Sequence, residues 1–144
     1  MQQTESILVD APAADVWNLV GSLEGWQHWN SGISNVELLA DKIGPGVEIA
    51  YRYRDREVRT TVDAYEEGRL LSIASNEKSY DFGESLSVEP EGDQTRVTFT
   101  MGFEPTVWWA RASSVLLVPF KDRVLGKPLR KELATLKQVA EEGA

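Results

Sequence analysis

The spacing of hydrophobic residues changes along the chain, from every second residue to every third or fourth. Between Ile33 and Phe103 apolar and polar residues alternate, which predicts strands with one buried and one wet face. Hairpin-length turns such as Glu66-Glu67-Gly68 separate these runs, so we expect about six antiparallel strands. After Pro105 the apolar spacing becomes three and four, which predicts helix; the residues that carry it are Leu125, Leu129, Leu133, Leu136 and Ala140.

The segment before the alternating region predicts one strand and two short helices. Thr4–Val9 alternates as a strand, and Pro12 suits the first turn of a helix because its missing N–H would be unpaired there. Apolar residues then recur at helical spacing, and Leu23–Trp29 is long enough for one further helical turn. The apolar residues of the first helix are Val16, Leu19, Val20 and Leu23.

Together these elements predict an α+β fold in one domain, residues 1–144. A curved antiparallel sheet with one apolar face needs a cover, and the carboxy-terminal helix is the element long enough to supply it. Pro119 and Pro128 lack the N–H that an α-helix uses, so we expect a kink or break between them.

Composition excludes several classes of function. The chain carries 15 Lys and Arg against 23 Asp and Glu, a formal charge of −8 that disfavours nucleic acid and anionic lipid surfaces. It has no cysteine and one histidine, which leaves no transition-metal constellation, and we expect no cofactor. We found no secretory signal and no apolar run near the roughly 20 residues of a membrane span. We therefore expect a cytoplasmic protein without stable membrane anchoring.

The stretch from Val9 to Ile33, VDAPAADVWNLVGSLEGWQHWNSGI, resembles the amino-terminal signature of the helix-grip (SRPBCC) superfamily. That superfamily includes START lipid-transfer domains, birch-pollen-allergen relatives and polyketide cyclase/dehydratase-like proteins. The Gly44-Pro45-Gly46 turn and the closing segment Leu129–Val139 fit the same pattern. The positions that match in the first stretch are Ala11, Pro12, Val16, Trp17, Trp26 and Trp29.

This resemblance implies a curved sheet gripping a long helix, with an apolar cavity between them. Relatives bind lipids, sterols, polyketides or other apolar molecules, and a minority catalyse cyclisation or dehydration. Trp26 and Trp29 fall where the family places structural aromatics, so we expect core or cavity-wall packing for both. His28 lies between them without a second catalytic group nearby, which favours an exposed or capping role.

Glu84 is the unusual residue of the predicted inner sheet face. Period two places it in the series Phe82, Glu84, Leu86 and Val88. A buried carboxyl group either finds a partner or raises its pKa and stays neutral, and both outcomes suit a ligand pocket. The alternative is that Glu84 reaches water at the end of the sheet, or that a bulge at Gly83 turns it outward.

Two further groups are candidates for contact with a ligand. Tyr51 and Tyr53 share an inner face, where each hydroxyl could orient a ligand, although plain core packing is the alternative. Trp108 and Arg111 share a helical face in the region that borders the cavity mouth in this family. Arg111 could hold a ligand oxygen or form a surface ion pair. The apolar segment Val107–Phe120 could line a large pocket or form a homodimer interface.

The sequence therefore predicts a protein that binds a small apolar or amphipathic molecule between its sheet and its last helix. One alternative is a polyketide cyclase/dehydratase-like enzyme without metal or nucleotide, with Glu84 and Arg111 as weak catalytic candidates. Another is a co-chaperone-like interaction module that uses the Trp108–Phe120 surface. The predicted ligand-binding residues are Trp29, Tyr51, Tyr53, Glu84, Phe99, Met101, Phe103, Trp108 and Arg111.

Overall fold

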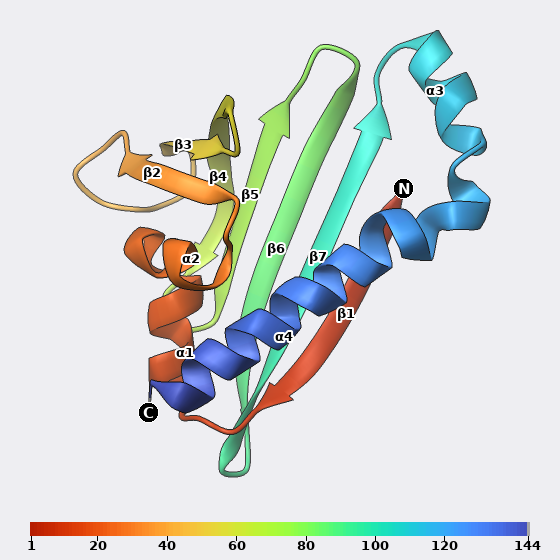
Figure 1. Cartoon of the computed structure of the whole chain (residues 1–144). Helices are drawn as coiled ribbons and strands as arrows, with labels where there is room; N and C mark the ends of the chain where they lie inside the picture. The colour runs from red at the N-terminus through yellow and green to blue at the C-terminus, as the bar shows by residue number, and fades with distance from the viewer. Residues whose placement is uncertain (144) are drawn as a thin grey trace.

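The computed structural model describes residues 1–143 and contains one antiparallel sheet of seven strands in the order β1-β7-β6-β5-β4-β3-β2. Every strand pairs with its sequence neighbour except β1, which crosses to β7. Figure 1 shows the sheet curving around the helix that ends the chain. The strands are β1 (Gln2–Val9), β2 (Ile33–Leu38), β3 (Glu48–Tyr53), β4 (Arg56–Glu66), β5 (Leu70–Asn76), β6 (Tyr80–Glu91) and β7 (Gln94–Pro105).

The helices lie in two groups. Between β1 and β2 the chain forms α1 (Ala13–Val20) and α2 (Leu23–Trp29), and after β7 it forms α3 (Trp108–Val115) and α4 (Lys127–Glu142). Figure 1 shows α4 crossing the sheet diagonally and ending beside α1, while α3 stands away from the sheet. This arrangement confirms the expected α+β helix-grip fold.

The core lies between the inner sheet face and helices α1, α2 and α4. Alternation places the buried side chains of β5, β6 and β7 on that face, as period two predicts. The apolar stripe of α4 meets them, with Leu129, Leu133 and Leu136 each at most 1% exposed. These contacts fix α4 on the sheet's inner side.

Trp26 and Trp29 fasten the α1–α2 pair to this core, as expected for structural aromatics. Each indole N–H donates to a backbone carbonyl oxygen near the end of α1, Trp26 to Val20 at 2.7 Å and Trp29 to Leu19 at 2.8 Å. Both rings are only 4% exposed. A buried indole needs such a partner for its N–H, so the two tryptophans hold the helix pair together as well as filling space.

The two prolines near the end of the chain have different effects. Pro119 lies in a 3-10 turn, η1 (Val118–Phe120), which breaks the helical run after α3. Pro128 lies in the first turn of α4 and follows a π-helical turn, η2 (Asp122–Gly126), that leads into α4 without a break. The expected interruption is therefore confirmed, and it consists of a 3-10 turn followed by a widened helical turn.

Candidate functional site

A cavity of about 270 Å³, partly open to solvent, lies between the sheet and α4, where β3 and β5 end and β6 begins. Its wall combines aromatic and aliphatic side chains with an unusual number of acidic groups. Alternating residues of the strands supply most of the wall, and α4 contributes one residue. The lining residues are Asn30, Ile33, Tyr51, Tyr53, Arg56, Val58, Ser75, Glu77, Tyr80, Phe82, Glu84, Met101 and Glu132.

Strand register explains why Glu84 belongs to this wall. Glu84 of β6 pairs with Ile73 of β5 on one side and with Met101 of β7 on the other. The β5–β6 register is continuous through Gly83, so no bulge turns Glu84 outward. Its carboxyl group lies among apolar neighbours, and burial, followed by the charge of Glu132, raises the pKa of Glu84 to about 8.

Glu132 is the second carboxyl group in the cavity and comes from α4. Burial raises the pKa of Glu132 to about 7, and its Oε2 is buried without a hydrogen-bond partner. The sequence analysis missed this residue, although a signal was present. Glu132 follows Leu129 by three positions and precedes Leu136 by four, so helical spacing places it on the apolar face of α4.

Tyr51 lines the same cavity as both carboxyl groups. Its ring meets Trp26 edge-on with centroids 6.1 Å apart, which fixes the ring against the α1–α2 pair. Burial, and then the negative charges of Glu84 and Glu77, raise the pKa of Tyr51, so its hydroxyl stays protonated. Tyr53 lies further out and is 39% exposed.

An ion pair borders the cavity at its outer end. The guanidinium of Arg56 lies 3.7 Å from a carboxylate oxygen of Glu77, and both residues line the cavity. Arg56 is thus paired with Glu77 at the edge of the cavity. Within residues 1–143 no ion pair involves Glu84 or Glu132. The inner part of the cavity carries acidic groups without a basic partner.

The structure brings four of the nine predicted site residues into this cavity: Tyr51, Tyr53, Glu84 and Met101. Trp29 and Phe99 meet each other edge-on in the core, with centroids 6.3 Å apart, and both are buried by protein. Phe103 packs edge-on against Tyr80, which does line the cavity. Ligand contact by any of these residues stays a prediction.

Trp108 and Arg111 lie on α3, apart from the cavity wall. Trp108 is 80% exposed, and Arg111 donates from Nε to the carbonyl oxygen of Pro105 at 3.3 Å. No residue of α3 is buried. The segment that follows is also exposed and apolar. Among residues 1–143, no helix is both long and apolar enough to cross a membrane.

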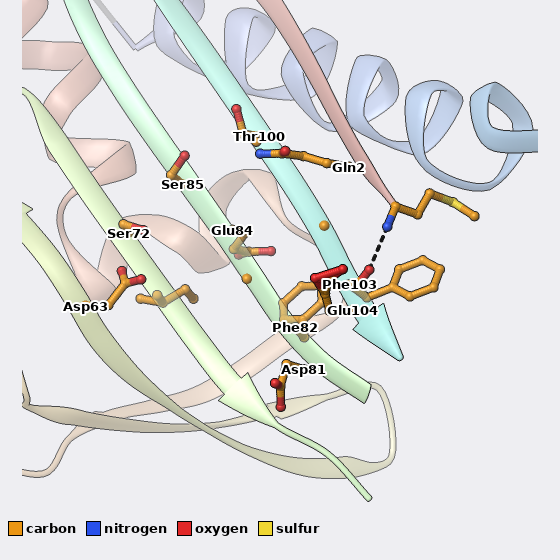
Figure 2. A pocket seen from close by; sticks show the side chains of 14 residues that line it. Gln2, Asp63, Ser72, Asp81, Phe82, Glu84, Ser85, Thr100, Phe103 and Glu104 are labelled. Carbon is orange, nitrogen blue, oxygen red and sulfur yellow. Dashed lines mark hydrogen bonds between the residues drawn. The ribbon is translucent and has the colours of Figure 1, made fainter. Parts of the chain in front are cut away.

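A second hollow of about 440 Å³ lies on the outer face of the sheet. It forms where Gly83 of β6 pairs with Gly102 of β7, since neither residue has a side chain to fill the surface. Figure 2 shows the polar side chains of Ser72, Ser85 and Thr100 along its floor. Within residues 1–143 no helix residue lines this hollow, so we take the cavity beneath α4 as the candidate site.

Comparison with known proteins agrees with this architecture. The family model described as polyketide cyclase/dehydrase and lipid transport matches residues 2–141. No curated protein matches the chain.

Three solved structures illustrate the shared fold. A START superfamily protein from Mycobacterium smegmatis superposes with a TM-score of 0.75 at 16% identity, covering 99% of both chains. A protein from Thermobifida fusca gives 0.74 at 21% identity, covering 96% of this chain and 92% of the other. The di-domain ARO/CYC protein BexL of the BE-7585A biosynthetic pathway gives 0.76 at 18%, covering 98% of this chain. The chain spans 46% of BexL's length, and these identities establish the fold alone.

Proposed function

Because the chain belongs to the polyketide cyclase/dehydrase and lipid-transport family, we propose that it binds a small amphipathic molecule in the cavity beneath α4. The observation that carries this proposal is the cavity itself, about 270 Å³ of space between the sheet and α4. Ligand sites in proteins are concave and mostly apolar with a few polar groups, and a hollow of this size and lining fits that description.

The wall chemistry supports an occupant with two unlike ends. Phe82, Met101 and Val58 offer apolar surface, where burial of a ligand contributes about 25 cal/mol per Å². Glu84, Glu132 and the Tyr51 hydroxyl offer polar atoms that fix its orientation. A purely apolar guest would leave the carboxyl groups without partners, whereas an amphipathic guest satisfies both parts of the wall.

Displacement of a neutral fluorescent probe tests this proposal. N-phenyl-1-naphthylamine brightens in apolar surroundings and should bind the protein in a saturable manner. Met101→Trp places a larger side chain on the cavity side of β7 and should weaken probe binding at least tenfold. Thr100→Trp is the matched control, because Thr100 faces the outer hollow and its replacement should leave probe affinity within twofold.

Two results would contradict the proposal. One is the absence of saturable binding to the folded protein. The other is equal loss of binding in Met101→Trp and Thr100→Trp at unchanged thermal stability, which would place the probe outside the cavity.

Proton transfer is a second candidate function, favoured by the presence of Glu84, Glu132 and Tyr51 in one cavity. Glu84 and Glu132 have pKa values of about 8 and 7, close to neutrality, where a carboxyl group can both give and take a proton. Dehydration of a β-hydroxyketone needs a base for the α-proton and an acid for the departing hydroxyl group, with water as the second product.

The substrate 4-hydroxy-4-phenyl-2-butanone tests this alternative, because its dehydration yields an absorbing enone. Turnover that Glu84→Gln and Glu132→Gln each reduce at least tenfold would support catalysis. Enone formation at the rate of buffer alone would leave binding as the function.

A further inference from the structure

The cavity has an uneven charge balance. Three carboxyl groups line it, those of Glu77, Glu84 and Glu132, against the single guanidinium of Arg56. Arg56 pairs with Glu77 at the rim, which leaves Glu84 and Glu132 as an uncompensated pair further inside. Once ionised, such a pair repels anions and attracts cations, and the low-dielectric wall of the cavity strengthens both effects.

The charged groups on the surrounding elements do not reach this pair. On α4, Arg130 contacts Glu5 and Asp122, and Lys137 contacts Glu141. On α2, His28 is exposed. On β3 and β6 the titratable neighbours in the cavity are the phenols of Tyr51, Tyr53 and Tyr80.

One atom shows that the pair is incompletely satisfied. Oε2 of Glu132 is buried and receives no hydrogen bond from any residue between 1 and 143. A buried polar atom without a partner destabilises a fold, and in native proteins such an atom is usually satisfied by a bound molecule, an ion or ordered water. A guest that donates hydrogen bonds would satisfy this oxygen.

The aromatic walls point in the same direction. Tyr51, Tyr53, Tyr80 and Phe82 line the same cavity as the two carboxyl groups. Aromatic ring faces attract cations through their negative quadrupole, and this attraction increases when water is excluded. An ammonium group offers three donors and one positive charge, so it matches both the rings and the carboxyl groups.

We propose that the cavity selects a ligand with a cationic amine head group and an apolar body, and that it rejects anionic amphiphiles such as fatty acids. This inference rests on the proposed binding function and adds the ligand class. The amine would lie between Glu84 and Glu132, and its apolar body would extend along Phe82 and Met101.

Three ligands of equal chain length separate this inference from the binding function itself: octylamine, 1-octanol and octanoate. Each is titrated against bound N-phenyl-1-naphthylamine at pH 8. We expect octylamine to displace the probe at least tenfold more tightly than 1-octanol, and octanoate to bind more weakly than both. Glu84→Gln and Glu132→Gln should each lower octylamine affinity by a larger factor than 1-octanol affinity, so that most of the amine's advantage is lost.

The pH dependence gives a second readout with a definite sign. The pKa values of Glu84 and Glu132, about 8 and 7, mean that both groups lose protons between pH 6 and 9, while octylamine stays charged. The affinity ratio of octylamine to 1-octanol should therefore rise with pH, by at most about tenfold per unit for each group still protonated.

Two outcomes overturn the inference in different ways. Equal affinities for octylamine and 1-octanol, with a ratio independent of pH, would leave the binding function intact and refute the choice of an amine. Failure of all three ligands to displace a saturably bound probe would refute the choice of amphiphile as well. Failure of the probe itself to bind would refute the proposed function.

Discussion

Glu132 of α4 and Glu84 of β6 line the same cavity, and the charge of Glu132 contributes to the raised pKa of Glu84. The two residues are 48 positions apart in the printed sequence and belong to the two layers that the fold brings together. β6 supplies one carboxyl group and α4 the other, so the charge of Glu132 reaches Glu84 only when α4 packs on the sheet.

Stability should fall as pH rises through the range in which these two groups titrate. Their pKa values lie at about 8 and 7 in the folded state, above the usual 4.5, so the folded protein holds more protons than the unfolded chain. The free energy of unfolding should therefore decrease from about pH 5 to pH 8, by a few kcal/mol in total. Urea denaturation at a series of pH values measures this slope.

Glu84→Gln and Glu132→Gln should each flatten that slope and raise stability at pH 8 relative to the parent. Glu67→Gln is the control, because Glu67 is exposed in the β4–β5 turn and its loss removes a similar charge without changing the cavity. A parent protein whose stability increases between pH 5 and pH 8 would contradict the burial of the pair.

Replacement of a tryptophan should affect stability very differently in the core and on the surface. Trp29→Ala removes a ring that is 4% exposed and hydrogen-bonded through its indole N–H, and should cost about 3–5 kcal/mol of unfolding free energy. Trp108→Ala removes a ring that is 80% exposed and should change stability by less than about 0.5 kcal/mol. Chemical denaturation of both variants checks the difference. A large loss in Trp108→Ala would mean that α3 is buried against a partner in solution.

A side chain at Gly92 in the β6–β7 turn should destabilise the protein. Gly92 has a φ of +65°, a left-handed conformation that costs other residues about 1–2 kcal/mol, so Gly92→Ala should destabilise the protein by that amount. Gly44→Ala is the matched control. Gly44 lies in open space without a positive φ, and its replacement should be neutral or slightly stabilising. Thermal unfolding distinguishes the two, and equal melting temperatures would contradict the turn geometry.

The ion-pair network of Arg130 should make a small contribution that salt reduces. Its guanidinium reaches Glu5 of β1 at 2.8 Å and Asp122 of η2 at 2.7 Å, but Arg130 is exposed. Arg130→Met should therefore cost at most about 1 kcal/mol at low ionic strength and less in 1 M NaCl. The comparison of denaturation midpoints at two salt concentrations is the measurement. A cost that does not depend on salt would point to lost packing of the side-chain stem.

Hydrophobic period predicted the order of elements and the inner face of each strand, because burial of one face selects a single register. It therefore placed Glu84 among apolar residues, and strand pairing set Met101 beside it. The same reasoning applied to α4 would have found Glu132 from its spacing to Leu129 and Leu136.

The alternation of apolar and polar residues could not distinguish strand residues that line the cavity from those that pack in the core. Phe99 and Met101 share the inner face of β7, yet Phe99 meets the Trp29 ring and Met101 meets the cavity. That difference depends on which residue of α2 or α4 lies opposite, a contact between segments far apart in the sequence. An apolar helical pattern also does not show whether a helix packs against the sheet. In α3, for example, Trp108 is exposed to solvent.

The π turn at Asp122–Gly126 bears on how this architecture can diversify. Deletion of one residue there would return the backbone to the ordinary α-helical pitch. The segment directly before the turn would then rotate by about 100° about the helix axis relative to α4. The exposed segment from Trp108 to Lys121 would point in another direction, while α4 stayed packed on the sheet with Glu132 in place. Deletion of a single codon in this π turn can thus change the orientation of the exposed segment without changing the cavity.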